Sequence, residues 1–223
     1  KILQDRNFWP IVKVTIIYVI VTLIFKVAFA VTLAVTTQYM VQHKHLGYLY
    51  RVIWLIPSTL PTMVYALFWK WFFNPSKDGT LNKFLMETFG LTYPVSWFNE
   101  GALGIVIVAA IVSGASGGMI LLAAQINSIG EDVFKAARID GAKEWAIIRD
   151  IILPALRWPI MYVTLTGAIS LFSSYHFIYL TTQGGPVYDT TTLSYYGFTL
   201  AFGQLRYGYG SAISFIVVII SIV

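Results

Sequence analysis

The chain has 223 residues, of which 57% are hydrophobic and only 11% carry a charge, with a mean hydropathy of +0.72. Because soluble globular domains carry about 25% charged residues, this composition predicts an integral membrane protein. The absence of cysteine excludes disulfides and thiolate metal sites, and neither a metal nor another cofactor is expected. The net charge of +5 is scattered between apolar runs, so nucleic acid is not an expected partner.

A helix needs about 20 apolar residues to cross the hydrocarbon core of a bilayer. Runs of this kind predict an all-α polytopic membrane protein with about five transmembrane helices, at 12–38, 52–72, 103–126, 159–181 and 208–223. No internal repeat or long linker divides the chain, so residues 1–223 are predicted to form a single transmembrane domain. No signal pattern opens the chain and its last run is still apolar, so we expect a piece of a longer protein with about six or more helices.

Two segments between the spans carry recognisable local signals. The stretch DGTLNKFLMETFG within 73–102 has apolar residues at helical spacing, which predicts a short amphipathic helix that ends at Gly90. The later segment 182–207 begins with a Gly-Gly-Pro turn and continues rich in aromatic residues, which suits the membrane interface. Lys and Arg divide equally between the two sides, so charge alone leaves the orientation open.

The segment 127–158 is unusually charged for this chain. Ser128 and Glu131 fit a capping box, which predicts a helix over about 129–139. Gly141 suits the left-handed residue that closes such a helix.

A second helix is predicted to follow Gly141. Trp145, Ile148 and Ile152 would share one face of it, and Pro154 lies near its end. The two helices together predict a bent platform outside the membrane.

The stretch FKAARIDGAKEWAIIRDIILP resembles the EAA loop of binding-protein-dependent ABC importer permeases, in the form found in the maltose-type carbohydrate branch. The segments YRVIWLIPSTLPTMVYALFWKWFFNP and TTQGGPVYDTTTLSYYGFTLAFGQLRYGYGSAIS are also similar to that branch. The resemblance implies a multi-pass permease in the plasma (inner) membrane of a prokaryote, with this loop in the cytosol. It implies as partners a pair of ATP-binding subunits, a second and typically non-identical permease subunit, and an extracytoplasmic sugar-binding protein.

The resemblance also implies that the first helix of the loop docks into a groove of the ATP-binding subunit. The residues expected to couple the two are Glu131, Lys135, Ala136, Ala137, Asp140 and Gly141. Lys135 stands where the family usually has glutamate, so the contact of that carboxylate is absent, reversed or taken over by Glu131 or Asp132. The alternative is an amphipathic hairpin that rests on the membrane surface.

Hydroxyl groups and one aromatic ring inside three spans suit a neutral, polyhydroxylated ligand. The expected substrate pathway consists of Ser58, Thr62, Ser113, Ser116, Ser173, Ser174 and Tyr175. These segments are similar to the sugar-contacting helices of maltose-type permeases, although Ser173 and Ser174 replace asparagines common there. Close helix packing is the alternative for each, since Gly114 and Gly118 form a small-xxx-small pair.

Lys26 and His176 are ionisable residues inside predicted spans, which makes them functional candidates. For Lys26, a structural lysine bonded to carbonyl groups of a neighbouring helix is the alternative. For His176, an interior histidine with satisfied hydrogen bonds is the alternative.

The predicted function is that of a permease subunit for a sugar or oligosaccharide, not of an enzyme. The chain has no phosphate-binding loop of the Gly-x-x-x-x-Gly-Lys-Ser/Thr type, so a partner must hydrolyse ATP. A permease for a phosphorylated or charged polyol such as a glycerol phosphate is the alternative. A membrane-embedded enzyme is a remote alternative, because no Asp or Glu lies within a predicted span.

Overall fold

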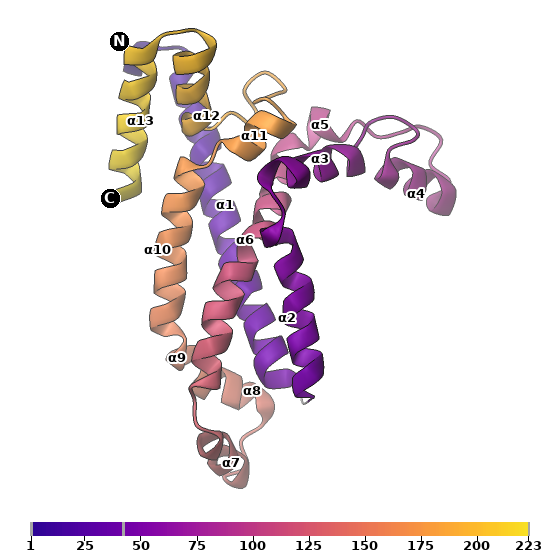
Figure 1. Ribbon diagram of the computed structural model, residues 1–223, viewed down its shortest axis with the longest axis vertical. Coiled ribbons are helices and arrows are strands. Elements are labelled where there is room, and N and C mark those ends of the chain that lie inside the picture. The colour runs from indigo at the N-terminus through magenta and orange to yellow at the C-terminus, as the bar shows by residue number, and fades with distance from the viewer. Residues whose placement is uncertain (1, 42, 223) are drawn as a thin grey trace. The chain divides into compact units, whose positions relative to one another are not determined.

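The computed structural model describes residues 2–41 and 43–222, and helices are the only regular secondary structure within those residues (Figure 1). Residues 1, 42 and 223 of the predicted domain lie outside this description. The chain divides into two compact units. The first contains Lys1–Thr22, Leu60–Ala110 and Ala168–Val223, and the second contains Leu23–Thr59 and Ile111–Gly167.

Two helical segments of the described residues are long and apolar enough to cross a membrane. They are Phe8–Met40, formed by α1 (Phe8–Val35) and the π-helical turn η2 (Thr36–Met40), and α6 (Ala102–Asn127). Counting each of two bent helix pairs as one further span gives up to four. The prediction of an all-α polytopic membrane protein is confirmed, and the number of crossings stays a prediction.

Proline explains why the predicted span 52–72 is two helices. The helix α2 (Lys44–Thr59) tolerates Pro57, but the helical path breaks at Leu60 and Pro61 before α3 (Thr62–Phe72). Pro61 has no N–H to donate and adopts an extended backbone with φ −53° and ψ 137°. A continuous helix over 52–72, as the hydropathy predicts, is therefore wrong.

The predicted span 159–181 is also interrupted. The helix α10 (Arg157–Ser173) ends at Ser173, and the short α11 (His176–Thr181) starts only after Tyr175, whose φ and ψ of −134° and −21° are not helical. The last predicted span corresponds to α13 (Tyr207–Ile222).

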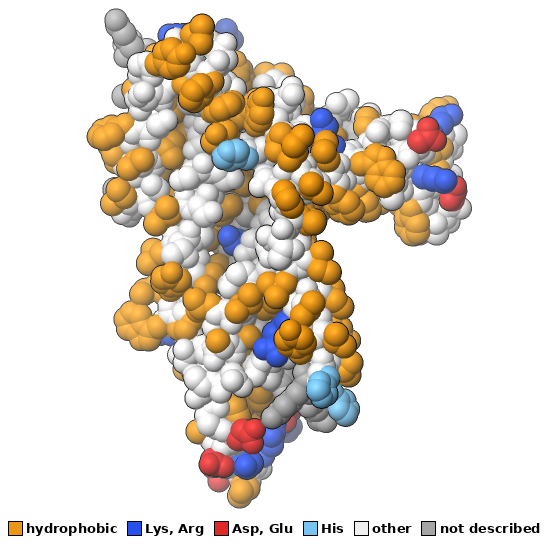
Figure 2. Space-filling model, in the orientation of Figure 1, with side chains coloured by type: hydrophobic (Ala, Val, Ile, Leu, Met, Phe, Trp, Pro, Cys, Tyr) orange, Lys and Arg blue, Asp and Glu red, His pale blue; other side chains and the backbone are white. Residues whose placement is uncertain are grey.

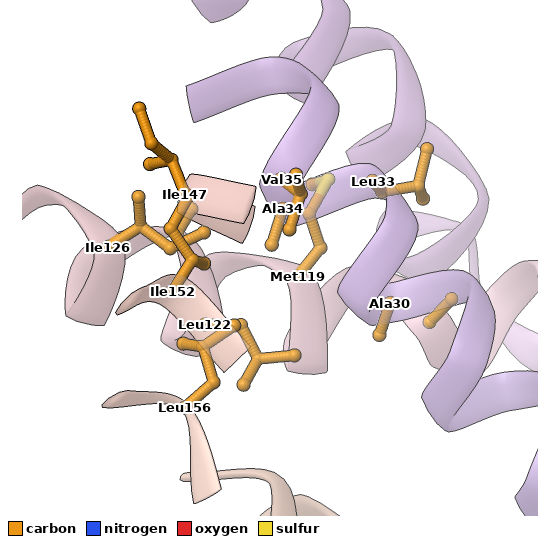
Figure 3. Packing of buried hydrophobic residues seen from close by; sticks show 12 residues of the cluster. Ala30, Leu33, Ala34, Val35, Met119, Leu122, Ile126, Ile147, Ile152 and Leu156 are labelled. Atoms are coloured by element: carbon orange, nitrogen blue, oxygen red, sulfur yellow. The ribbon is translucent and has the colours of Figure 1, made fainter. Parts of the chain in front are cut away.

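The core of the second unit joins the C-terminal parts of α1 and α6 to the second half of the charged loop. Figure 3 shows Ile147, Ile152 and Leu156 of that segment next to Ile126 and Leu122 of α6. The remaining buried members, from α1 and α6, are Ala30, Leu33, Ala34, Val35, Ala115, Met119 and Ala123. Burying a large aliphatic side chain contributes about 1.5–3 kcal/mol, so this cluster anchors the loop to the spans.

This core corrects the predicted face of the second loop helix. The residues buried there are Ile147 and Ile152, whereas Trp145 is 68% exposed. The chain runs from α8 (Glu144–Ile147) into a π-helical turn, η3 (Ile148–Ile152), and on into α9 (Leu153–Ala155). A π turn holds more residues than an α turn, so the face expected from a 3.6-residue period shifts.

The first unit packs the start of α1 against the end of the chain. Its apolar cluster consists of Phe8, Ile11, Leu193, Tyr196, Leu200, Ile213 and Val217. The last five lie on α12 (Leu193–Phe198), on the π-helical turn η4 (Thr199–Gly203) and on α13. In Figure 1, α12 and α13 run side by side. Gly197 and Gly210 allow this approach, because a Cβ on Gly210 would lie 2.8 Å from the carbonyl oxygen of Gly197.

The segment between α3 and α6 is organised around one buried amide. Its helices are α4 (Thr80–Phe89) and the four-residue α5 (Trp97–Glu100). The Asn82 side chain accepts hydrogen bonds from the Val95 N–H and the Trp97 Nε1–H, and donates to the carbonyl groups of Asn74, Ser76 and Val95. The predicted helix end at Gly90 is confirmed, with φ +68°. A short 3-10 helix, η1 (Ile2–Gln4), precedes α1.

Candidate functional site

The charged loop forms a platform of two helices, which we call the coupling platform: α7 (Glu131–Ile139), α8 and the turn between them. Figure 2 shows Asp, Glu, Lys and Arg side chains gathered at the end of the second unit that α7 occupies. Glu131 and Asp132 lie in the first turn of α7 and Arg138 in its last, which suits the helix dipole at both ends.

The predicted capping box is wrong. The residue before α7 is Gly130, and it makes no side-chain capping bond. The Ser128 hydroxyl instead donates to the Gln125 carbonyl over 2.7 Å and accepts from Gln125 Nε2 over 3.2 Å. Ser128 therefore caps the end of α6, because its own N–H is still bonded to the carbonyl groups of the last helical turn.

The turn after α7 matches the prediction for Gly141, whose φ is +82°. The Gly141 N–H donates to the Arg138 carbonyl over 3.1 Å, and the Ala142 N–H donates to the Ala137 carbonyl over 2.9 Å. This pair of bonds is the Schellman motif, which needs a left-handed residue where Gly141 stands. The angle between α7 and α8 is thus set by backbone geometry that glycine adopts without strain.

Tyr39 tethers the coupling platform to the end of the first span. Its hydroxyl donates to Glu144 Oε2, and its ring lies 5.3 Å from the ring of Phe134. Arg138 Nε donates to Glu144 Oε1 over 3.2 Å, and its guanidinium carbon lies 6.0 Å from the centre of the Tyr39 ring. The hydrogen bond to Glu144 raises the pKa of Arg138. One tyrosine therefore contacts both α7 and the first residue of α8.

A second set of bonds holds the neighbouring helix ends together. The Gln38 side chain accepts from Arg51 Nη1 over 2.8 Å and donates to Asn127 Oδ1 over 3.0 Å. These residues lie on η2, α2 and α6. Gln38 thus joins the end of α6 and the middle of α2 to the turn η2, which also carries Tyr39.

The two sides of α7 differ in what they contact. At 3.6 residues per turn, residues two apart point in nearly opposite directions. Phe134 and Ala137 pack against the core of the second unit. The outward face carries Asp132, Val133, Ala136, Ile139 and Asp140, all of them exposed.

The predicted coupling residues therefore separate into groups. Ala136, Asp140 and Glu131 are exposed, whereas Ala137 is half-buried against the chain's own core. Lys135 Nζ lies 3.4 Å from Asp132 Oδ1 and 3.9 Å from Glu131 Oε2, so both carboxylates of the first turn pair with it. Such exposed pairs contribute little to stability. They leave the three charges available to a partner.

The predicted pathway residues of the second unit are Ser58, Ser113 and Ser116. The buried Ser116 hydroxyl donates to the Trp54 carbonyl over 2.6 Å, which joins α6 to α2. Ser58 is exposed and donates to the carbonyl of Leu55 on its own helix. Ser113 is half-buried. Ser116 thus serves helix packing in this chain, the alternative that the sequence left open.

The predicted pathway residues of the first unit are Thr62, Ser173, Ser174 and Tyr175. Ser173 is exposed at the end of α10, and Thr62 is exposed at the start of α3. The Tyr175 ring stacks on Phe198 at 4.7 Å and 24° and on exposed His176 at 4.1 Å and 25°. The break between α10 and α11 thus presents hydroxyl groups beside an aromatic surface.

Sequence reasoning missed Tyr39, Glu144 and Phe198. Phe198 lies in a segment recognised only as rich in aromatic residues. Tyr39 and Glu144 are 105 positions apart, so no local pattern links them. The one sequence feature that could have drawn attention to Tyr39 is its residue type, since tyrosine is enriched at the membrane interface.

Comparison with known proteins gives relatives over nearly the whole chain. The chain is 26% identical to the lactose transport system permease protein LacF of Rhizobium radiobacter, over 98% of this chain and 74% of that protein. It is 27% identical to the sn-glycerol-3-phosphate transport system permease protein UgpA of Agrobacterium fabrum, over 99% of this chain and 74% of that protein.

Among solved structures, the fold matches a chain of a bacterial alginate ABC transporter in complex with an alginate pentasaccharide-bound periplasmic protein. The TM-score is 0.89 at 22% identity, over 99% of this chain and 76% of that one. The sequence pattern of the binding-protein-dependent transport system inner membrane component matches residues 26–223, and the chain therefore belongs to this family of multi-pass inner-membrane permeases.

Proposed function

We propose that the chain is a permease subunit of an ABC importer that takes up a sugar or oligosaccharide. A pair of ATP-binding subunits would hydrolyse ATP in the cytosol and dock on α7. A second permease subunit would complete the pathway, and an extracytoplasmic sugar-binding protein would deliver the substrate. The relative named for lactose supports a sugar as substrate, and the relative named for sn-glycerol-3-phosphate supports the alternative, a phosphorylated polyol.

The observation that carries the proposal is the outward face of α7. Val133 is 47% exposed and Ile139 is 86% exposed, and the small Ala136 lies between them. A helix face of this kind suits a groove on a partner protein, because the small residue lets the helix backbone approach closely while the two apolar side chains anchor it.

The charge of this face argues against a helix that rests on lipid. Asp132 and Asp140 flank Ala136 on it. Interfacial helices carry Lys and Arg toward anionic headgroups, and carboxylates there would be repelled. The outward face of α7 is therefore better suited to a protein partner with basic groups than to a membrane surface.

For the pathway, we propose that Ser173, Ser174 and Tyr175 contact the substrate, together with Ser58, Thr62 and Ser113. The stack of Tyr175 on Phe198 supports this, since flat aromatic surfaces and several hydroxyl groups suit a sugar ring. Ser116 has its hydroxyl committed to Trp54 and is the weakest member of the set.

Co-purification tests the proposal. The permease would be expressed with its ATP-binding subunits and partner permease, and the ATP-binding subunit retained on a tagged permease would be quantified. Asp132→Lys with Asp140→Lys is expected to reduce the retained subunit, because the outward face then repels a basic groove. Asp78→Lys with Glu87→Lys is the matched control, since both carboxylates are also exposed but lie in the 73–102 segment. Equal retention by both variants would contradict docking through α7.

A further inference from the structure

Lys26 is a charged residue deep within the first span. At about 1.5 Å per residue it lies about 27 Å of helix from Phe8 and about 20 Å from Met40. Its neighbours Ile24 and Phe25 are 60% and 58% exposed on the outside of the helix, whereas Lys26 is half-buried. An ionisable side chain at this depth is costly and is a functional candidate by default.

Glycines on two other helices make room for the Lys26 side chain. A Cβ built on Gly114 of α6 would lie 2.6 Å from Lys26 Cε and 2.9 Å from Nζ. A Cβ on Gly167 of α10 would lie 3.8 Å from the same Nζ. The ammonium group thus lies directly against the backbone of α6, in space that any larger residue at position 114 would take.

Lys26 has no hydrogen-bond or ion-pair partner among the residues that the structure describes. Among residues 2–41 and 43–222, no hydrogen bond or ion pair involves its Nζ, so the alternative of a lysine bonded to carbonyl groups is not supported. The Asp and Glu residues all lie outside the predicted spans. An unpaired charge in an apolar surrounding destabilises the folded chain, so a role outside stability must account for it.

From these contacts we infer that Lys26 is a recognition site for an anionic group, a carboxylate or a phosphate, on the transported sugar or polyol. This inference rests on the proposed import function and narrows its substrate class. A lysine is a compact point charge that accepts either anion without a fixed bonding geometry. A permanent ion pair with the partner permease is less favoured, because such a pair is seldom more stable than apolar packing.

The test uses the complete complex in proteoliposomes, with its binding protein. Uptake would be measured for a neutral oligosaccharide, for its uronic acid counterpart and for a hexose phosphate. For the wild type, we expect uptake of at least one anionic compound, and which one identifies the anion as carboxylate or phosphate. Lys26→Met is expected to lower kcat/KM for that compound by about 10- to 100-fold, the range for losing a charge-assisted bond. Lys26→Arg keeps the positive charge and is expected to retain part of the wild-type kcat/KM.

Two glycine variants separate a binding role from a folding defect. Gly114→Ala adds a methyl group where Lys26 Cε lies, so the lysine side chain must move, and anion uptake is expected to fall by less than in Lys26→Met. Gly117→Ala is its matched control on the same helix, because a Cβ there meets nothing within 4 Å. Its uptake is expected to equal that of the wild type.

Several outcomes would overturn the inference. A wild-type complex that takes up only the neutral compound would refute it while leaving the import function intact. Loss of complex assembly in Lys26→Met would mean that Lys26 is instead paired across a subunit interface. If none of the three compounds enters, the proposed function fails and this inference with it.

Discussion

At the scale of single residues, Gly141 determines how the coupling platform is built. Its φ of +82° falls in the left-handed region, and two hydrogen bonds of the turn depend on that conformation. A side chain would meet no neighbour there, since nothing lies within 4 Å of its Cβ position. Any effect of substitution would therefore come from backbone strain and not from a clash.

Gly141→Val is expected to destabilise the turn by about 1–2 kcal/mol, the strain of a left-handed residue with a side chain. The amount of ATP-binding subunit retained in co-purification should decrease as a result. Gly130→Val is a matched control, because Gly130 also has open space around its Cβ but an ordinary φ of −59°. If Gly130→Val reduced retention as much as Gly141→Val, backbone conformation at 141 would not be the cause.

Asp5 is a carboxylate of the first unit whose hydrogen bonds link the stability of that unit to pH. It accepts hydrogen bonds from the Tyr196 hydroxyl over 2.6 Å, the Asn7 N–H over 3.0 Å and the Tyr209 hydroxyl over 3.3 Å. These bonds, the Tyr196 bond first, lower its pKa below the usual value. A carboxylate with a lowered folded-state pKa stabilises the fold above its unfolded-state pKa, and that stabilisation is lost as pH falls through the folded-state pKa.

The Tm of the purified wild-type chain is therefore expected to drop as pH falls below about 4, the unfolded pKa of an aspartate. Asp5→Asn should have a lower Tm at neutral pH and a shallower decrease in acid. Asp78→Asn, a change at an exposed carboxylate, is the control and should keep the wild-type slope. Identical slopes for all three proteins would rule out Asp5 as the titrating group.

At the scale of elements, α7 works through two faces with different tasks. Phe134 and Ala137 hold it to the chain's own core, while Ala136 lies on the outward face. A substitution on one face should therefore affect docking, and a substitution on the other should affect the fold.

Ala136→Trp is expected to overpack the contact with the ATP-binding subunit. Overpacking costs about 1–3 kcal/mol, which corresponds to a rise in the Kd of the complex of about five- to hundredfold. The Tm of the isolated permease should stay unchanged. Ala137→Trp is the comparison, because it should lower the Tm by crowding the core. Titration of the ATP-binding subunit onto immobilised permease measures the first effect. Undiminished binding by Ala136→Trp would remove the outward face from the docking site.

Tyr39→Phe tests the tether between η2 and the coupling platform. The variant keeps the ring against Phe134 but loses the hydrogen bond to Glu144. Substrate-stimulated ATP hydrolysis is expected to fall by about two- to tenfold, the range for one hydrogen bond. The ATP-binding subunit should still bind. Tyr48→Phe is the control, since Tyr48 is exposed and makes no hydrogen bond among the described residues. Full stimulation in Tyr39→Phe would contradict the tether.

The sequence predicted the long elements and missed the interruptions. Hydropathy identifies α1 and α6 because their apolar runs are unbroken, and Gly90 and Gly141 mark helix ends because only glycine enters the left-handed region freely. Proline marks a possible break, but α2 continues through Pro57 and ends before Pro61. The bond of Ser128 to Gln125 and the π turn at 148–152 depend on competition between nearby hydrogen bonds. A pattern of residue types does not contain the outcome of that competition.

The candidate site follows the same division. The coupling loop is recognisable from local sequence. The contact of Tyr39 with Glu144 joins positions 105 residues apart, and that of Lys26 with Gly114 joins two different helices, so no local pattern reveals either one. Ser116 shows what residue type alone does not reveal, because its hydroxyl donates to the carbonyl of Trp54 on another helix. Which hydroxyl groups remain available is decided by packing.

At the scale of the whole molecule, the chain joins apolar spans to the charged coupling platform, and its family is the inner membrane component of binding-protein-dependent transport systems. The chain itself has no phosphate-binding loop. Under the proposed function, energy therefore enters through a partner at α7 and substrate passes through the spans.

Uptake of a radiolabelled saccharide into proteoliposomes that contain the full complex, with ATP trapped on the side of the ATP-binding subunits, tests this claim most directly. Accumulation is expected to need ATP, the binding protein and an intact α7, and to be lost in Ala136→Trp. Accumulation without ATP, or undiminished accumulation in Ala136→Trp, would contradict it.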